Sequence, residues 1–393
     1  MQAIAVAWQI YGLTHRPLDL GFVGLAQFAP AVLLFLVAGH TADRFPRKSI
    51  VAVCYASFSI CSVLLLALTL GGISSTLPIY AVLLFNGTVR AFNGPASSAF
   101  LPLLVAEEHF PNAVTWGSSI YQTANVLGPV AGGLIYGVAG SPIPVYSSAV
   151  VAFIAAFFLV SRIRLQAVSR PARSVSLETL LEGFRYIWRQ QLILGAISLD
   201  LFAVLLGGAV ALLPVYAREI LRIGAYGLGV LRSAPSLGAV LMAITIAHFP
   251  LRRRAGRTML VCVFGFGVLT VIFGMSRNFA VSLAALVLLG ACDMISVIVR
   301  QTLVQIATPD EMRGRVSAVS GLFIGASNEL GGFESGVTAQ WFGTVPAVVL
   351  GGVGTMLIVS LWSWRFPELR RANRLVPEPA PRLAAQTAET STP

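Results

Sequence analysis

Seven ionisable residues interrupt long apolar stretches of this sequence: Arg90, Asp200, Arg232, Asp293, Arg300, Glu329 and Glu334. A charged side chain inside an apolar, membrane-length segment is costly, so such residues usually mark ion or substrate pathways. Desolvation favours the protonated form of a carboxyl group, and a nearby arginine favours the ionised form. The chemistry open to these residues is therefore proton binding and release. The candidate proton carriers are Asp293, Glu329 and Asp200.

The same stretches supply candidate partners for these carboxylates. Asp293 and Arg300 are seven residues apart, so they share one face of a helix. This spacing fits a proton-coupling pair, but it also fits a purely structural neutralisation. Asp200 is predicted to pair with Arg232 on the next helix. The alternative for Arg232, and also for Glu334, is a position near a water-exposed helix end. Candidate counter-charges or substrate ligands are Arg90, Arg300 and Asn125, and the amide of Asn125 is equally suited to a helix–helix contact.

Composition indicates a polytopic membrane protein. Of 393 residues, 56% are hydrophobic and 11% are charged, and the mean hydropathy is +0.81, whereas soluble domains carry about 25% charged residues. The cysteines, Cys54, Cys61, Cys262 and Cys292, all lie in apolar stretches and show no metal-ligand spacing. A cleavable signal peptide and a P-loop are not recognisable, so bound ATP is not indicated. We expect no cofactor, no metal and no catalytic residue.

The net charge of +11 is explained by topology rather than by nucleic acid. Most of the lysines and arginines fall between alternate apolar segments, at the ends expected to be cytoplasmic. An anionic inner leaflet attracts such segments. The charge pattern therefore predicts a membrane protein with a cytoplasmic C-terminus.

Twelve helices in two six-helix halves are expected. Their ranges are 1–13, 20–39, 50–70, 79–105, 113–138, 145–160, 192–216, 226–247, 259–275, 279–306, 316–340 and 345–364. The halves, 1–160 and 192–364, repeat one plan, as expected for a duplicated six-helix unit. The segment 161–191 is predicted to be a cytoplasmic linker with an amphipathic helix behind Ser176. A disordered cytoplasmic tail is predicted over 365–393.

The first segment, Met1–Leu13, is short for a membrane crossing. At 1.5 Å per residue it reaches about 20 Å, against a hydrocarbon core of about 30 Å. We therefore expect a truncated first helix, with Met1 not the natural start or the protein functionally impaired. The alternative is a short, tilted helix in a locally thinned bilayer.

Two local patterns have a defined physical role. Gly39-His40-Thr41-Ala42-Asp43-Arg44-Phe45-Pro46-Arg47-Lys48 forms a tight basic turn between apolar runs. Gly39 allows close helix approach, and Asp43 offers a carboxylate to a facing helix N-terminus or an arginine, as a latch on one closed state. Arg44, Arg47 and Lys48 hold the turn at the cytoplasmic face. In the second pattern, Gly128-Pro129-Val130-Ala131-Gly132-Gly133, the proline kinks a helix and the glycines permit close packing.

These patterns resemble signatures of the major facilitator superfamily. The basic turn is similar to that superfamily's loop between helices 2 and 3, and Gly128, Pro129, Gly132 and Gly133 match its antiporter motif. The segment Thr308-Pro309-Asp310-Glu311-Met312-Arg313-Gly314-Arg315-Val316 resembles the drug-exporter branch that includes the enterobactin and macrolide exporters. The resemblance covers essentially the whole chain.

The resemblance implies an all-α major facilitator fold. It also implies export of a small, partly apolar, drug-like molecule across a bacterial inner membrane by alternating access and proton antiport. The expected partners are protons, the small-molecule substrate and the lipid bilayer, and the expected oligomeric state is a monomer. The alternatives are a siderophore exporter and a non-transporting, receptor-like protein of the same fold. An intramembrane enzyme is disfavoured, because the sequence has no nucleophile–base or metal pattern.

The topology is testable by labelling. A cysteine introduced at Ser169 or Ala385 should resist a membrane-impermeant thiol reagent on intact cells, because the surrounding arginines place both segments in the cytoplasm. Labelling after the cells are opened is the positive control. Ready labelling of either position on intact cells would contradict the predicted orientation.

Overall fold

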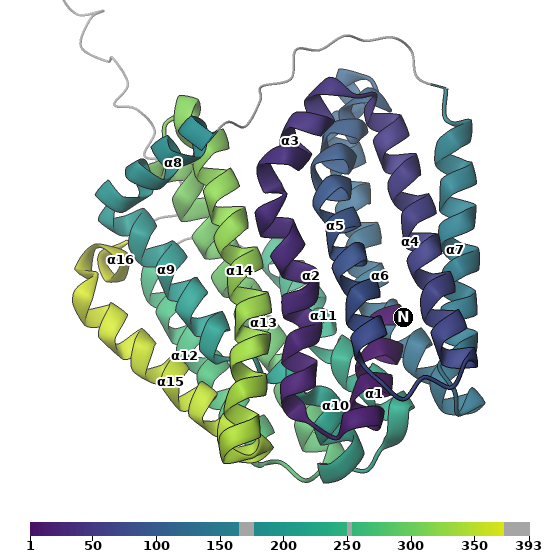
Figure 1. Cartoon of the computed structure of the whole chain (residues 1–393). Helices are drawn as coiled ribbons and strands as arrows, with labels where there is room; N and C mark the ends of the chain where they lie inside the picture. Colours follow the sequence, from purple (N-terminus) through teal and green to yellow (C-terminus); the bar gives the residue numbers. More distant parts are fainter. Residues whose placement is uncertain (165–176, 250–253, 373–393) are drawn as a thin grey trace, which may run out of the picture.

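The computed structural model describes residues 1–164, 177–249 and 254–372, and every element of regular structure in them is a helix. The chain folds into two groups of packed helices (Figure 1), and the two groups contact each other mainly near one end of the molecule. The first group contains α1 (Gln2–Thr14), α2 (Pro17–Leu33), α3 (Phe35–Arg44), α4 (Arg47–Leu70), α5 (Leu77–Phe100), η1 (Leu101–Leu103), η2 (Glu107–His109), α6 (Phe110–Ala139) and α7 (Ile143–Arg162).

The second group begins after α8 (Leu177–Arg189). It contains α9 (Gln191–Leu206), η3 (Ala209–Leu212), α10 (Leu213–Val215), η4 (Tyr216–Ile220), α11 (Gly224–His248), α12 (Ala255–Met275), α13 (Phe279–Ala307), α14 (Asp310–Phe342), α15 (Thr344–Arg365) and α16 (Pro367–Arg371). The expected cap at Ser176 and the predicted tail beyond residue 372 lie outside the described residues.

Seven helical segments of the described chain are long and apolar enough to cross a bilayer. They are Arg47–Leu70, Ile143–Arg162, Gln191–Ile220, Gly224–His248, Ala255–Met275, Phe279–Ala307 and Thr344–Arg365. Large apolar side chains remain exposed on them, for example Leu159 at 68% and Val261 at 70%. Backbone hydrogen bonds satisfied within each helix and an apolar outer surface are the two properties that a lipid environment requires.

Two predicted helices are interrupted in the structure. The segment predicted as one helix from Leu20 to Gly39 divides at Leu34 into α2 and α3, one turn after Pro30. The helix predicted over 192–216 ends at Leu206 and resumes as a 3₁₀ turn and a π-helical turn. At Gly208 a Cβ would lie 2.5 Å from the Gly331 carbonyl oxygen, so this break admits close approach of α14.

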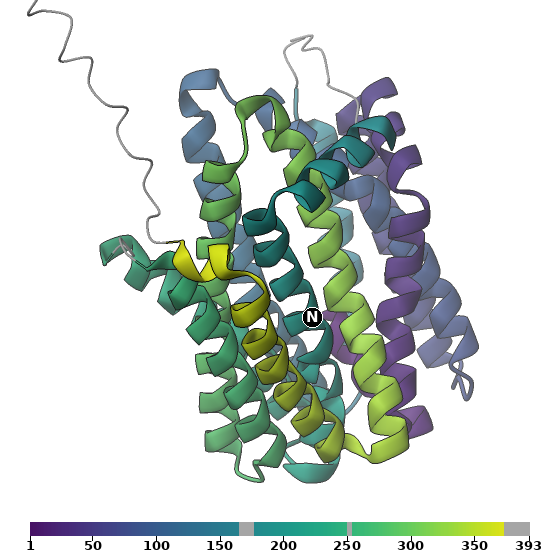
Figure 2. The ribbon, with the colours of Figure 1, turned by 90° about the vertical axis from the view of Figure 1, so that its left-hand side faces the viewer.

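The two groups meet along α2 with α14 and along α6 with α11, and α14 runs beside α2 in both views (Figures 1 and 2). Glycines allow this contact. A Cβ on Gly21 of α2 would lie 3.0 Å from the Phe333 Cα, and one on Gly133 of α6 would lie 2.8 Å from the Gly229 Cα of α11. These contacts concentrate toward the end of the molecule at the bottom of Figure 1, which we call the closed end.

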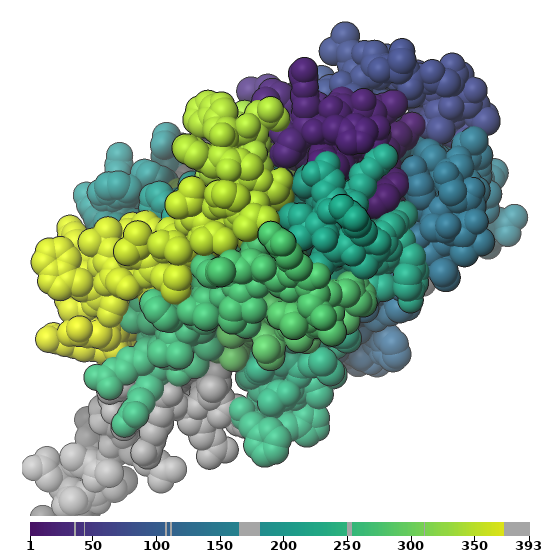
Figure 3. Space-filling model, turned by 90° about the horizontal axis from the view of Figure 1, so that it is seen from below, coloured from purple at the N-terminus to yellow at the C-terminus, as the bar shows by residue number. Residues whose placement is uncertain are grey.

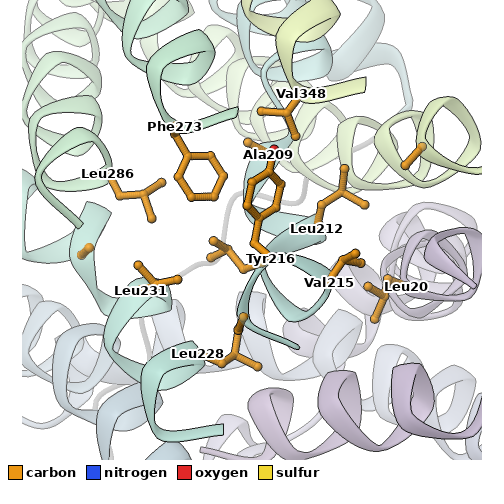
Figure 4. Packing of buried hydrophobic residues seen from close by; sticks show 14 of the residues in the cluster. Leu20, Ala209, Leu212, Val215, Tyr216, Leu228, Leu231, Phe273, Leu286 and Val348 are labelled. Carbon is orange, nitrogen blue, oxygen red and sulfur yellow. The ribbon is translucent and has the colours of Figure 1, made fainter. Parts of the chain in front are cut away.

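An apolar cluster seals the closed end. Leu20 of the first group and Leu212, Tyr216, Phe273 and Leu286 of the second are each no more than 5% exposed (Figure 4). Viewed from below, the purple N-terminal residues pack directly against teal and yellow-green residues, and no opening separates them (Figure 3). Burial of such side chains contributes about 1.5–3 kcal/mol each, so parting the groups here is costly.

The opposite end, which carries α3 and α8, is open between the groups. A Cβ added at Gly39, Gly117, Gly314 or Gly321 would meet no other atom within 4 Å. A cavity of about 480 Å³ lies on the first group at this end, bordered by Leu101, Val114, Gly117, Ser118, Tyr121 and Gln122. The structure is thus closed at one end and open at the other.

The helix predicted in the linker is present as α8 and packs on α14 at the open end. Ile187 is buried against Val316 and Val319, and Glu182 forms an ion pair with Arg315. Trp188 remains 65% exposed on its outer side. The helix is therefore docked on the second group and keeps an apolar surface.

The tight crossing of α11 on α13 supplies a stability prediction. A Cβ at Gly238 of α11 would lie 1.8 Å from the Val287 carbonyl oxygen of α13, so Gly238→Ala should destabilise the protein by about 1–3 kcal/mol through overpacking. Gly117→Ala, in open space on α6, is the matched control and should be neutral or slightly stabilising, because Ala favours helix over Gly by about 1 kcal/mol. Thermal unfolding of the purified protein in detergent measures both. Equal apparent Tm values for the two variants would refute the assigned contact.

Candidate functional site: two charged clusters inside the bundle

The first charged cluster lies within the second group and joins α9 to α13. Arg300 Nη2 is 3.3 Å from Asp200 Oδ2, and the two side chains are only 3% and 6% exposed. Two ions removed from solvent are stable only when paired with each other. The sequence spacing placed Arg300 on one face with Asp293, and both lie close to Asp200.

Asp293 completes this cluster. It borders a small cavity of about 10 Å³ together with Asp200, Cys292 and Ser296. Unlike Asp200, it is half-buried rather than buried. Among the described residues, neither Ser296 Oγ nor Arg300 Nε has a hydrogen-bond partner. Two carboxyl groups thus share one guanidinium, and one proton on the pair makes the cluster neutral.

The predicted pairing of Asp200 with Arg232 is wrong. Asp200 faces α13 and pairs with Arg300, whereas Arg232 Nη1 donates to the Val210 carbonyl oxygen at 3.0 Å. Asp200 lies on α9 and Arg232 on α11, the next long helix in the sequence. The side of α9 that carries Asp200 faces α13 rather than α11.

The second charged cluster lies between the groups, and we call it the central charged site: Arg90 of α5, Arg232 of α11 and Glu329 of α14. Both arginines interact electrostatically with the Glu329 carboxylate. Arg90 Nη1 also donates to Gln27 Oε1 of α2 at 3.2 Å. A Cβ at Gly24 of α2 would lie 2.8 Å from Glu329 Oε2, so the carboxylate rests directly on the opposite group.

The arginines of the central charged site are exposed although they lie well inside their helices, and Glu329 is half-buried. The amino group of Met1 is near Arg232 as well. Sequence reasoning singled out Arg90 and Glu329 but did not bring them together, because their contact depends on how α5 and α14 face each other.

The predicted gating turn lies at the open end. Arg47 Nη1 donates to the Ala99 carbonyl oxygen at 3.3 Å, and Lys48 Nζ donates to the Ser161 carbonyl oxygen at 2.8 Å. Both acceptors belong to last turns, of α5 and α7, where carbonyls lack helical partners and cations are favoured. The exposed Arg44 ends α3. The backbone of Asp43 lies in α3, and its side chain falls outside the description.

The predicted antiporter motif lies at the contact between the groups. A Cβ on Gly229 of α11 would lie 2.5 Å from the Pro129 carbonyl oxygen, and Gly133 meets the same helix. Gly128 and Gly132 instead face Met1. The motif therefore serves close packing of α6 on α1 and α11.

Two further candidates stand apart from both clusters. Asn125 is half-buried on α6, and its amide makes no hydrogen bond among the described residues. Glu334 accepts a hydrogen bond from Thr338 Oγ1 at 2.7 Å within α14.

Sequence reasoning missed a polar contact at the closed end. The Tyr11 hydroxyl of α1 donates to Glu219 of η4, and the Arg218 guanidinium lies 5.5 Å from the Trp8 ring centroid. Through these contacts Trp8 and Tyr11 join α1 to the second group. The available signal was the charged Arg218-Glu219 pair, which lies just beyond the predicted end of a helix.

Comparison with known proteins identifies relatives of this chain. The family model described as a transmembrane secretion effector matches residues 1–392. The chain is 27% identical over 384 residues to enterobactin exporter EntS of Shigella boydii serotype 18, covering 95% of this chain and 90% of the relative. The same values hold for enterobactin exporter EntS of Escherichia coli O139:H28. The resemblance noted from the motifs is confirmed.

Solved structures share the fold. The nucleoside transporter NupG has a TM-score of 0.71 at 14% identity, covering 93% of this chain and 94% of that chain. The inward open xylose transporter XylE from E. coli has a TM-score of 0.69 at 13% identity, covering 93% and 92%. A bacterial homologue of the human lysosomal transporter Spinster, inward-facing and unoccupied, has a TM-score of 0.69 at 14% identity, covering 96% and 95%.

The buried pair gives an ordered prediction for stability. Arg300→Met should destabilise the protein by about 3–5 kcal/mol, the range for removing one partner of a buried ion pair. Asp200→Asn should cost less, because Asp293 leaves a second carboxylate near Arg300. Denaturant unfolding in mixed micelles at neutral pH measures both. If Asp200→Asn is the more damaging change, Asp293 does not compensate for it.

Proposed function

The chain belongs to the transmembrane secretion effector family of the major facilitator superfamily, and from this premise we propose that it exports a small, partly apolar molecule by proton antiport. It is a multi-pass membrane transporter and not an enzyme. In the proposed cycle, residues 1–160 and 192–364 act as two halves that rock against each other and open a cavity between them to each side in turn. The contrast between a closed end and an open end supports this cycle.

The observation that carries the proton-coupling proposal is the cluster of Asp200, Asp293 and Arg300. Two carboxyl groups compete for one guanidinium in a buried position. A proton added to Asp293 leaves a neutral Asp200–Arg300 pair, whereas its loss leaves one uncompensated negative charge. Rearrangement of α9 against α13 within the second half would change this balance. In the proposal, proton binding is therefore linked to switching through the packing of the second half.

The substrate proposal rests on the cavity and on the relatives. Leu101, Val114 and Tyr121 provide apolar and aromatic surface in the cavity at the open end, beside the polar Ser118 and Gln122. Such a surface suits a drug-like molecule. A siderophore is the second candidate, favoured by the similarity to enterobactin exporters.

We propose that the basic turn is part of the gate at the open end, which we assign to the cytoplasmic side. Arg47 and Lys48 fasten α4 to the ends of α5 and α7, so the turn moves as one unit with them. In the proposed opposite state, Asp43 latches this unit to the second half. The latch contributes about 1.5–3 kcal/mol, the range for hydrogen bonds to charged groups.

Transport into inverted membrane vesicles tests the proposal. Strains lacking and overexpressing the protein first identify a substrate from a panel of drugs and siderophores. Wild-type vesicles should then accumulate it when a pH gradient is applied, and Asp293→Asn should abolish this accumulation while downhill exchange remains measurable.

Asp19→Asn is the matched control, because Asp19 accepts a hydrogen bond from Tyr80 near the closed end and belongs to neither cluster. It should retain accumulation. Retained gradient-driven transport in each of Asp200→Asn, Asp293→Asn and Glu329→Gln would place coupling elsewhere. Absence of transport of every panel compound by the wild type would favour the receptor-like alternative.

A further inference from the structure

We infer that the central charged site, Arg90 with Arg232 and Glu329, binds the anionic group of an amphipathic organic anion. The inference rests on the proposed function and narrows its substrate class. Glu329 occupies the site in the structure as an internal anion that an incoming carboxylate or sulfonate displaces.

Location is the first argument. Arg90 lies about halfway along α5 and Arg232 well inside α11, and both are exposed. A guanidinium at such depth is not stable against lipid, so an exposed one must face the interior or a wet cavity. Arg90 donates to Gln27 of α2, and Glu329 lies against Gly24 of the same helix, one turn away. These contacts place the site where the two groups meet, and both arginines interact electrostatically with Glu329.

Charge is the second argument. Two guanidiniums face one carboxylate, so the site carries excess positive charge at the centre of the bundle. Each guanidinium has five N–H donors in a planar fork suited to carboxylate, sulfonate or phosphate oxygens. The hydrogen bonds found among the described residues use one nitrogen of each, toward Gln27 Oε1 and the Val210 carbonyl oxygen.

Reachability distinguishes this site from the other cluster. Arg300 is 2% exposed and Asp200 is 5% exposed, so a solute anion has no access to that guanidinium. The central charged site instead takes one arginine from each group, so an anion held by both would bridge the two groups.

Glu329 explains how binding is linked to movement. Its carboxylate lies against Gly24 of α2 and interacts with Arg90 of α5, so it contributes to the contact of α14 with the first group. An anion that takes over the arginines releases this attraction. Substrate and Glu329 therefore compete, and removal of the Glu329 charge should strengthen anion binding.

Equilibrium binding to the purified full chain in detergent tests the site. The probes are 1-naphthoate, 1-naphthamide and 1-naphthylmethylamine, which share a ring system and differ in charge, measured by titration calorimetry without any gradient. We expect 1-naphthoate to bind at least tenfold more tightly than the other two. Arg90→Gln and Arg232→Gln should each weaken 1-naphthoate binding about tenfold or more and leave 1-naphthamide binding within about twofold.

The carboxylate gives the sharpest comparison. Glu329→Gln should tighten 1-naphthoate binding severalfold, whereas Glu334→Gln, on the same helix but bonded to Thr338, should leave it unchanged. If the glutamine variants of either arginine fail to fold, Arg90→Lys and Arg232→Lys, which keep the charge, should retain the preference for the anion. No binding of 1-naphthoate to the wild type, equal affinity for all three probes, or weaker binding in Glu329→Gln would overturn the inference.

The binding result is independent of the transport result. Selective anion binding in a protein that accumulates no panel compound would refute proton-driven export and leave the anion site intact. Gradient-driven export combined with equal probe affinities would refute only the anion site.

Discussion

A charge held inside the bilayer must be compensated within the protein, and this constraint organises the interior of the bundle. Asp200 and Arg300 are buried away from solvent and pair with each other across two helices, and the half-buried Glu329 lies near opposite charges on two other helices. The helices α9, α13 and α14 are therefore positioned by electrostatic pairing as well as by apolar contact. A shift of any one of them changes the balance of charge in its cluster.

The charge balance of the two clusters depends on different helix movements. The Asp200–Arg300 pair with Asp293 lies inside one group of helices, so its charge balance depends on packing within that group. The central charged site takes its members from both groups, so its charge balance depends on how the groups meet. Under the proposed proton antiport, these two kinds of dependence rest on separate residues joined through the second group.

The ends of the molecule are built by different forces. At the closed end, glycine contacts such as Gly133 with Gly229 and the apolar cluster around Tyr216 hold the groups together. At the open end, Arg47 and Lys48 stabilise helix ends within the first group and α8 packs on α14. Strong contacts inside each group and few between them at one end allow each group to move as a unit.

Sequence alone determined the membrane class, most of the helices and the identity of the charged candidates. Apolar length, Gly and Pro positions and the basic turns report on local structure and on lipid, and both act through near neighbours in the chain. Tertiary structure alone decided that Asp200 meets Arg300 rather than Arg232, that Tyr11 meets Glu219, and that Arg90 lies near Glu329. These contacts join residues about one hundred to more than two hundred positions apart, and they depend on the rotation of each helix about its axis. Because that rotation is set by the packing of the whole bundle, no local pattern in the sequence could determine it.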